Sequence, residues 1–527
     1  MSAFVYRDFS TLRAALLARQ ELALIDVREE AEFAQSHPLF AVNIPLSKLE
    51  LEAYRRIPRR GTPITVYDNG DGRAEQAAAR LRQFGYGDVA LLAGGLAGWQ
   101  AGGGELFQDV NTPSKAFGEL VESRRHTPSL TAQQVKALID QHADVVIVDA
   151  RRFDEYQTMS IPTGTSVPGA ELVLRINALA PDPNTQVIVN CAGRTRSIIG
   201  TQSLINAGIS NPVAALRNGT IGWELAGFAL ESQQQRRYPD GVENRAQAQQ
   251  QARRVADAAG VVRIDRETFG LWRQDTTRTT YLFDVRSPEE YHAGHVPGSD
   301  SAPGGQLVQE TDHYASVRGA RVVLVDDDGV RANMSASWLA QMGWEAAVVD
   351  GLLSAADFTE QGGPAAQLPP SPPTDDITPA QLAALLAQEG TVLLDFTTSA
   401  NYVARHIPGA YWVIRSQLPL ALEKLPPAER YVVTCGSSLL ARYAVPEVAA
   451  LTGKPVQLLA GGTQAWIAEN RPLEKGEGRL AAPRIDRYRR PYEGTDNPRD
   501  AMQAYLDWEF GLVEQLARDA THGFNVL

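Results

Sequence analysis

A cysteine that directly follows an apolar run is the residue of this sequence best suited to covalent chemistry. Val187-Ile-Val-Asn leads into Cys191, six small, polar or cationic residues follow, and a second apolar run covers 198–205. We interpret this stretch as a buried strand, a tight loop and the first turn of a helix. A cysteine placed there faces backbone N–H groups and the positive end of a helix dipole, which favour the thiolate. We therefore expect an exposed nucleophile that can hold a transferable atom. The alternative is that Cys191 is a small buried hydrophobe.

The same strand-to-loop pattern occurs four times along the chain. An aspartate ends an earlier strand-like run in each copy, and the loop residue follows it at a nearly constant spacing. Each copy closes with an element similar to Gly-Gly-x-x-x-Trp. The four aspartate and loop pairs are Asp26 and Asp68, Asp149 and Cys191, Asp284 and Asp326, and Asp395 and Cys435. Such a period predicts a tandem array of four similar units.

Within each unit, strand-like runs alternate with helical patterns. This order predicts an α/β fold in which each unit is a small, mainly parallel sheet with helices on both faces. Ligand sites in such sheets lie beyond the carboxyl ends of the strands, which is where the four loop residues are expected.

Composition and charge narrow the class of protein. A chain of 527 residues is too long for one core, and 44% hydrophobic with 21% charged residues is ordinary for a soluble globular protein. The net charge of −12 argues against nucleic acid or a membrane surface as partner. Two cysteines exclude a disulfide framework and fit a reducing compartment. No apolar run is long enough to cross a membrane and the first residues lack a signal-peptide pattern, so we expect a cytoplasmic protein.

Five short motifs together resemble the rhodanese (thiosulfate sulfurtransferase) family. They are Asp-x-Arg, Glu-Tyr, Pro-Gly-Ala, Cys-x-x-x-x-Arg-Ser and Gly-Gly-x-x-x-Trp, in that order, and the resemblance runs four times over about residues 10–475. The arrangement looks like a bacterial sulfurtransferase with four tandem rhodanese-like domains, followed by a C-terminal helical tail. The expected boundaries are 8–108, 127–232, 262–365 and 376–475 for the domains, and 476–527 for the tail.

The resemblance implies a reaction and a set of site residues. Cys191 would attack a sulfane sulfur in thiosulfate or a related small anionic donor, form a persulfide and pass the sulfur to cyanide or a thiol. Neither a cofactor nor a metal is implied. Cys191 and Arg196 are the expected catalytic residues. The expected substrate-binding residues are Ala192, Gly193, Arg194, Thr195, Ser197 and Arg151.

The arginines near Cys191 have different expected roles. Arg196 is the fifth residue after the cysteine, and Arg73 and Arg331 stand at the same place in two loops that lack cysteine. We therefore favour an ion pair that braces the loop, with Asp149 or Glu155, over direct contact with substrate. Arg194 is unique to the second unit and is the better candidate for gripping an anion. Arg151 and Arg175 are weaker candidates, because a surface or salt-bridging arginine explains each better than substrate binding does.

The other three loops differ at the nucleophile position. Asp68 and Asp326 can accept N–H bonds and cap the helix but cannot carry a persulfide, so the first and third units are expected to be inactive. Cys435 is a candidate second site. Its loop has Leu440 at the bracing position, although the opening Cys-Gly-Ser partly resembles mercaptopyruvate sulfurtransferases. The alternative is a small residue retained at a strand end.

Two other classes of function stay open. In one, the chain is a protein-to-protein persulfide carrier, with the inactive domains as docking surfaces for a sulfur-acceptor protein. In the other, it is a cysteine-dependent phosphatase or arsenate reductase. The latter is disfavoured because Cys191 and Arg196 form Cys-x4-Arg, one residue shorter than the Cys-x5-Arg of rhodanese-like phosphatases.

The tail after the last repeat predicts an amphipathic helix that starts at Asn497-Pro498. Its apolar stripe must be buried against a neighbouring domain or against a second subunit in a homodimer. The histidines His37, His295 and His406 are expected to be structural, since they show no metal-ligand spacing. The stripe comprises Met502, Tyr505, Leu506, Phe510, Leu512, Val513 and Leu516.

Overall fold

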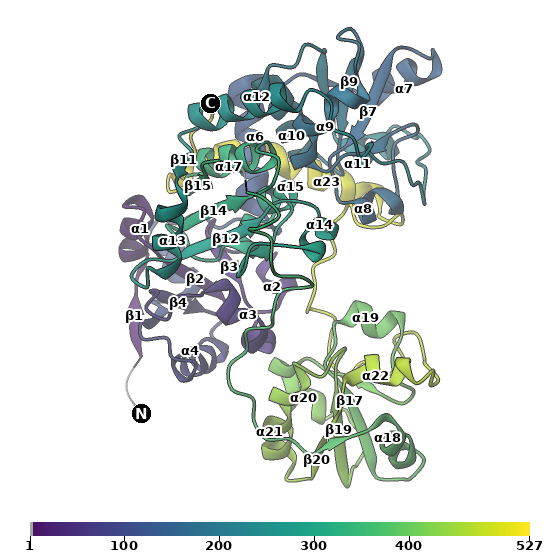
Figure 1. Ribbon diagram of the computed structural model, residues 1–527. Helices are drawn as coiled ribbons and strands as arrows, with labels where there is room; N and C mark the ends of the chain where they lie inside the picture. The colour runs from purple at the N-terminus through teal and green to yellow at the C-terminus, as the bar shows by residue number, and fades with distance from the viewer. Residues whose placement is uncertain (1–3, 352) are drawn as a thin grey trace.

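Four parallel sheets organise the chain. The computed structural model describes residues 4–351 and 353–527. Each repeat forms a five-stranded sheet in which the fourth strand in chain order lies at the centre and the first strand lies at one edge. We call these sheets, with their helices, the first to fourth domains (Figure 1). The prediction of an α/β fold with four tandem units is confirmed.

The first domain has the strand order β1-β5-β4-β2-β3, and the other three domains repeat this order. All strand pairs within the sheets are parallel. The strands are β1 (Val5–Arg7), β2 (Ala23–Asp26), β3 (Ala41–Asn43), β4 (Ile64–Tyr67) and β5 (Val89–Leu92); β6 (Ser129–Leu130), β7 (Val145–Asp149), β8 (Thr165–Ser166), β9 (Gln186–Asn190) and β10 (Val213–Leu216); β11 (Val262–Ile264), β12 (Thr280–Asp284), β13 (Asp300–Ser301), β14 (Arg321–Val325) and β15 (Glu345–Val349); and β16 (Asp376–Ile377), β17 (Thr391–Asp395), β18 (Tyr411–Trp412), β19 (Arg430–Thr434) and β20 (Val456–Leu459).

Helices follow the strands in every domain. They are α1 (Phe9–Leu17), α2 (Glu30–Phe33), α3 (Leu49–Arg56), α4 (Arg73–Gln83) and α5 (Gly95–Ala101); α7 (Ala132–Asp140), α8 (Phe153–Thr158), α9 (Leu172–Leu179), α10 (Thr195–Ala207) and α11 (Gly219–Leu225); α13 (Arg266–Gln274), α14 (Pro288–Ala293), α15 (Gly304–Gln309), α16 (Thr311–Tyr314) and α17 (Arg331–Gln341); and α18 (Pro379–Leu386), α19 (Ser399–Ala404), α20 (Leu418–Leu422), α21 (Ala441–Thr452) and α22 (Gly462–Ala468).

Strand β9 shows why both faces of the sheet carry helices. Val187 and Val189 point into a core that includes Leu172 of α9 and Leu204 of α10. Ile188, between them, packs in a separate core with Trp223 of α11. Since successive strand residues face opposite sides, an unbroken apolar run requires a helical layer on each side.

Two linking helices join the first three domains into one body. Helix α6 (Thr112–Arg125) is buried along most of its length and packs against α10, while α12 (Arg245–Ala258) packs against α10 and α17. The first and third domains share a hydrophobic core. The fourth domain lies to one side (Figure 1), where Arg415 forms ion pairs with Glu50 of the first domain and Glu447 of its own.

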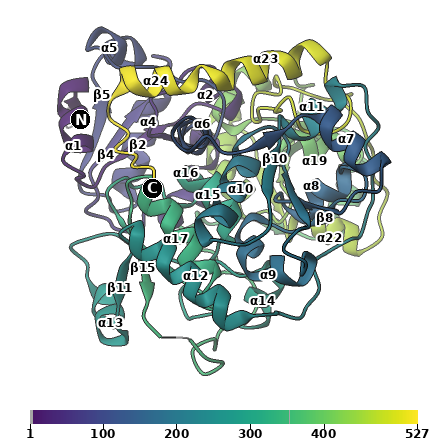
Figure 2. The same ribbon diagram turned by 90° about the horizontal axis from the view of Figure 1, so that it is seen from above.

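The tail folds as two helices, α23 (Arg499–Phe510) and α24 (Leu512–Asp519), rather than the single helix expected. They lie across the top of the view in Figure 2, from α11 of the second domain toward α5 of the first. Met502, Tyr505 and Leu506 pack with Ile221 of α11. Phe510, placed in the apolar stripe, is instead 53% exposed because the helix ends there. The apolar face is thus buried against neighbouring domains of the same chain, the first of the two alternatives.

Candidate active site

Cys191 lies at the carboxyl end of β9, between the strand and the first residue of α10. The equivalent loops of the other domains place Asp68 after β4, Asp326 after β14 and Cys435 after β19. Each loop residue is therefore at the end of a strand near the middle of its sheet, the place where parallel α/β sheets form their ligand sites.

The Cys191 side chain is buried, with only 2% of the residue exposed. Burial raises the pKa of the thiol, and it outweighs the charge of Arg196 and the hydrogen bond from the N–H of Ser197, which lower that pKa. The expectation of an exposed thiolate with a lowered pKa is therefore wrong for this conformation. The physical reason is desolvation, since α6 and α23 cover the loop.

Arg196 braces the loop as predicted. Its guanidinium forms two hydrogen bonds to Glu155 of α8, at 2.8 and 2.9 Å. Burial alone would raise the pKa of Glu155, but the charge and hydrogen bonds of Arg196, together with the charges of Arg151 and Arg152, outweigh it and lower this pKa to about 2. Asp149, the other candidate partner, pairs with Arg151 instead, at 2.7 Å.

The same brace recurs in two domains that have no cysteine. Arg73 contacts Glu32 at 2.7 Å in the first domain, and Arg331 contacts Glu290 at 2.7 Å in the third. The ion pair is thus present with or without the nucleophile, and in each of these domains it ties the loop to the helix that follows the second strand. This pairing therefore belongs to the architecture of the loop.

Arg194 is held by carboxylates of α6. Its guanidinium forms ion pairs with Glu119, at 2.7 Å, and with Glu122, both on α6. It also donates to the Asn218 side chain at 3.2 Å and lies over the ring of Phe510. Because these carboxylates already occupy the guanidinium, substrate binding by Arg194 stays a prediction without support from this geometry. Glu119 and Glu122 lie more than 70 residues before Arg194 in the chain, so the residues around Arg194 could not predict these partners.

The loop backbone is clamped by the start of α11. Thr220 N donates to the Cys191 carbonyl at 2.9 Å, and Ile221 N donates to the Ala192 carbonyl at 3.0 Å. Gly219 has a φ of +55°, and a Cβ there would lie 2.2 Å from the Cys191 carbonyl oxygen. Only glycine allows this approach, and Gly462 of the fourth domain approaches the Cys435 carbonyl in the same way, with a Cβ there 2.4 Å from the oxygen.

The other predicted loop residues also have defined surroundings. Thr195 begins α10 and packs against Gly118 of α6, where a Cβ would lie 3.0 Å from the Thr195 methyl group. The Ser197 hydroxyl contacts the Arg194 carbonyl at 2.8 Å. Gly193 faces α23, since a Cβ on it would lie 3.2 Å from the ring of Tyr505.

The tail contributes two polar residues that sequence reasoning missed at the site. Tyr505 donates a hydrogen bond from its hydroxyl to Glu509 at 2.8 Å, and both side chains are buried beside the Cys191 loop. Burial raises the pKa of Glu509 to about 8. The sequence feature that could have predicted this pair is the spacing of four residues between Tyr505 and Glu509, which places the two side chains next to each other on a helix.

A polar cavity of about 430 Å³ lies on the other side of Arg196. Its wall combines side chains of the second domain, the end of α15 and the tail segment that precedes α23. Five arginines and four carboxylates line the cavity, so its wall carries a small net positive charge. The charged lining residues are Arg151, Arg152, Asp154, Glu155, Arg196, Glu310, Arg487, Arg490 and Glu493.

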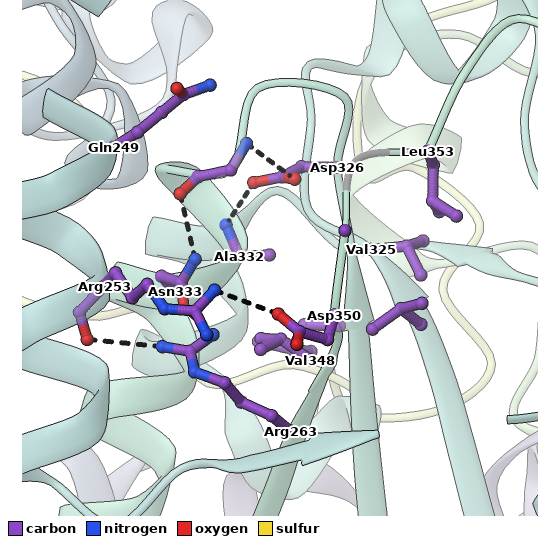
Figure 3. A pocket seen from close by; sticks show the side chains of 14 residues that line it. Gln249, Arg253, Arg263, Val325, Asp326, Ala332, Asn333, Val348, Asp350 and Leu353 are labelled. Carbon is purple, nitrogen blue, oxygen red and sulfur yellow. Dashed lines mark hydrogen bonds and ion pairs between the residues drawn. The ribbon is translucent and has the colours of Figure 1, made fainter. Parts of the chain in front are cut away.

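The aspartates of the first and third domains occupy the amide nests themselves. Asp326 accepts hydrogen bonds from the backbone of Gly329, at 3.0 Å, and Ala332, at 2.7 Å, as Figure 3 shows. Asp68 accepts from Gly70 and Ala74, at 2.7 and 2.8 Å. The expected capping role of a carboxylate is thus observed. That these domains are inactive stays a prediction.

A cavity of about 190 Å³ lies beside Asp326 (Figure 3). Its two arginines are already engaged, because Arg253 pairs with Asp350 at 2.9 Å and Arg263 donates to Asn333 at 3.1 Å. Burial raises the pKa of Asp326 to about 8. The third domain therefore keeps a pocket at the carboxyl ends of its strands, but an aspartate stands there in place of the cysteine.

Cys435 lies in a nest without the brace. The N–H groups of Ala441, Leu440 and Ser438 lower the pKa of its thiol, but burial outweighs them and raises it. The Leu440 side chain is buried in the core of the fourth domain, where the other loops have arginine. Whether Cys435 acts as a second site stays a prediction.

The three histidines near the Pro-Gly turns are buried against aromatic rings. His37, His295 and His406 stack on Phe33, Tyr291 and Tyr402, with ring centroids 3.9, 3.8 and 3.8 Å apart. This packing supports a structural role. Across residues 4–351 and 353–527, no group of three or more His, Cys, Asp or Glu side chains could hold a metal ion. In the same residues, no helix has both the length and the apolarity to span a bilayer.

Comparison with known proteins identifies the class. A rhodanese-like domain family model matches residues 10–102, 131–226, 271–355 and 378–469. These stretches make up more than half of the sequence, so the chain belongs to the rhodanese-like domain family.

One solved structure is similar over the whole length. A thiosulfate sulfurtransferase from Pseudomonas aeruginosa is 70% identical in sequence, with 99% of this chain and 100% of that chain covered and a TM-score of 0.98. The shared arrangement therefore includes all four domains and the tail.

Curated relatives match shorter stretches. Uncharacterized protein YqhL from Bacillus subtilis (strain 168) is 40% identical over 76 residues, 14% of this chain and 59% of that protein. Uncharacterized protein slr1261 from Synechocystis sp. is 30% identical over 99 residues, 19% of this chain and 54% of that protein. Thiosulfate sulfurtransferase PspE from Escherichia coli (strain K12) is 35% identical over 72 residues, 14% of this chain and 68% of that protein. The chain thus spans little more than half the length of the first two.

Proposed function

We propose that this protein is a sulfurtransferase in which Cys191 takes a sulfane sulfur from thiosulfate, or a related donor, and passes it to cyanide or a thiol. The observation that carries the proposal is the braced loop. Among the described loops, that of the second domain alone combines a cysteine with the Arg196–Glu155 ion pair. The similarity to a thiosulfate sulfurtransferase over the whole chain supports the same activity.

The reaction consists of two displacements at sulfur. The Cys191 thiolate attacks the outer sulfur of thiosulfate, an S–S bond forms to Sγ, and the bond to the sulfonate sulfur breaks, with its electron pair leaving as sulfite. Cyanide or a thiolate then attacks the terminal sulfur of the persulfide, and the Cys191 thiolate leaves. No redox cofactor is consumed, because the acceptor takes the sulfur atom without its bonding electron pair.

The loop stabilises the charge that this chemistry needs. The N–H of Ser197 donates toward the Cys191 sulfur, while the Ser197 hydroxyl donates to the Arg194 carbonyl. Arg196 supplies a fixed positive charge held by Glu155. These groups favour the thiolate, whereas burial opposes it. Because burial prevails and the thiol pKa is raised, we expect sulfur uptake to become faster as pH rises through neutrality.

The arginine-rich cavity beside Arg196 is the proposed approach for the anionic donor. Four further arginines line it, two on the second domain and two on the tail segment. Each is paired with a carboxylate, so a dianion gains only the attraction of a small net positive charge before it reaches the buried loop. The four arginines are Arg151, Arg152, Arg487 and Arg490.

A persulfide carrier is the second candidate function. The observation that favours it is the 2% exposure of Cys191, which limits access for small donors unless a partner protein displaces the cover. A carrier would accept sulfur from a donor protein but turn over slowly with thiosulfate and cyanide. No contact of the described residues favours phosphatase or arsenate reductase chemistry.

Intact mass after incubation with thiosulfate tests the proposal. We expect the wild type and Cys435→Ser to gain one sulfur atom and Cys191→Ser to gain none. A thiosulfate:cyanide assay then separates an enzyme from a carrier. Retention of the added sulfur by Cys191→Ser would contradict the assignment of the nucleophile.

A further inference from the structure

Glu509 is the buried polar group near Cys191 whose presence the rhodanese-like fold does not explain. It comes from α23, outside the four matched domains, and none of its surface is exposed. Its Oε1 accepts the hydrogen bond from Tyr505 at 2.8 Å, whereas Oε2 is buried with no hydrogen-bond partner among the described residues. An unpaired buried carboxyl oxygen is costly and calls for a partner that is bound during function.

The unpaired oxygen, Oε2 of Glu509, packs against the loop that carries Cys191. A Cβ on Gly193, two residues after Cys191, would be 3.5 Å from Glu509 Oε2. Negative charge on Glu509 raises the pKa of the Cys191 thiol, in the same direction as burial. The carboxyl group therefore lies against the Cys191 loop, near enough for its charge to act on the sulfur.

Charged and polar groups surround Glu509 on every side. The charge of Glu119 raises the pKa of Glu509, and Lys115, the Tyr505 hydroxyl and Arg194 lower it, but burial is the largest influence. Two of these neighbours are already paired, because Lys115 contacts Asp109 at 2.6 Å and Arg194 contacts Glu119 at 2.7 Å. Tyr492 packs on Tyr505 from the tail segment before α23. None of these cations forms an ion pair with Glu509 in the described residues.

We propose that Glu509, in its protonated form, belongs to the sulfur-transfer site: Oε2–H donates a hydrogen bond to the terminal sulfur of the Cys191 persulfide. This inference rests on the proposed function and adds to it a group supplied by the C-terminal helix. The proton stays on the carboxyl group throughout, and only the S–S bonds described above form and break. Ionised Glu509 would instead place a negative charge beside the persulfide anion and disfavour it.

The test compares the pH profiles of sulfur loading and turnover in the wild type and Glu509→Gln. A carboxyl with a pKa of about 8 is about one-tenth protonated one pH unit higher, so in that range the wild type loses the hydrogen bond from Glu509, which opposes the gain from the Cys191 thiolate. The glutamine amide keeps an N–H donor at every pH. We expect Glu509→Gln to match the wild type near neutrality and to exceed it about tenfold one unit above pH 8.

A second variant separates hydrogen bonding from packing. Glu509→Leu fills the same space without a charge but cannot donate, so kcat should fall about tenfold to a hundredfold at neutral pH while the unfolding temperature is kept or raised. A Glu509→Leu protein with wild-type kcat would show that the carboxyl group is structural and would overturn the proposal. Glu514→Gln, on the exposed side of α24, is the matched control and should leave the profile unchanged.

The two proposals fail in different ways. If the wild type takes up no sulfur from thiosulfate, the proposed function is overturned, and the role of Glu509 with it. If the wild type takes up sulfur and Glu509→Gln shows the same pH profile as the wild type, only the role of Glu509 is overturned.

Discussion

Cys191 and Cys435 occupy the same position in two copies of one fold, yet their surroundings differ. Both are buried at the end of a strand, and burial raises the pKa of both thiols. Only the Cys191 loop has the arginine brace, and only that loop is covered by the C-terminal helix. The backbone nest thus comes with the fold, whereas the charge beside the sulfur depends on individual side chains.

The fourth domain lacks both members of the brace. Leu440 takes the place of Arg196, and Asn401 precedes Tyr402 where Glu155 precedes Tyr156 in the second domain. Because both members are replaced, neither side chain is left without its partner at this position. The rhodanese-like unit therefore forms without the brace in the fourth domain, although the other three domains keep it.

The largest expected effect separates the two cysteines directly. Cys191→Ser should reduce thiosulfate:cyanide turnover by at least about a thousandfold, because the nucleophile is removed. Cys435→Ser should stay within about twofold of the wild type, since no charged brace supports that thiol. The two variants are compared at equal concentration after their unfolding curves have been shown to match. A large loss in Cys435→Ser would make the fourth domain a second site.

Removal of the brace should affect both stability and activity. Arg196→Leu removes two short hydrogen bonds from the half-buried Glu155 and leaves it the longer contact with Arg152, at 3.5 Å. It should therefore cost about 2 kcal/mol of unfolding free energy in the second domain. Urea unfolding measures this cost. Glu155→Gln combined with Arg196→Leu reproduces the pattern of the fourth domain and should recover part of it. If the single variant unfolds like the wild type, the ion pair contributes nothing.

Acid should reveal the same ion pair through its pH dependence. The pKa of Glu155 is lowered from 4.5 to about 2 in the folded protein, so the unfolded chain binds its proton first as pH falls. The stability from this group is present above pH 4.5 and is lost as pH falls toward 2. Comparison of wild type and Arg196→Leu unfolding between pH 6 and 3 isolates the effect. Parallel curves would contradict the lowered pKa.

The smallest expected difference concerns thiol reactivity. Both thiols should be alkylated slowly at neutral pH and faster as pH rises, because both pKa values are raised. Cys435, at 6% exposure and without a covering helix, should react somewhat faster than Cys191, at 2%. Peptide mass mapping after timed alkylation gives the two rates. Faster labelling of Cys191 would show that the tail opens in solution.

The repeats, the sheets and the brace were predictable from the sequence because each rests on a local or periodic pattern. Strand-length apolar runs that alternate with helical segments predict a parallel α/β unit, and four copies make the period visible. Arg196 was assigned to an ion pair because Arg73 and Arg331 occupy the same position in loops that have no cysteine. Comparison among the repeats took the place of a comparison among homologues.

Tertiary structure alone decided the state of the Cys191 thiol and the partners of Arg194. The thiol pKa depends on desolvation, which sums over every atom packed around the sulfur, including α23 more than 300 residues further along the chain. Arg194 meets Glu119 and Glu122 because α6 packs against α10, a contact that no spacing in the sequence encodes. Local patterns determine which elements form, whereas burial and long-range charge pairs depend on how those elements pack.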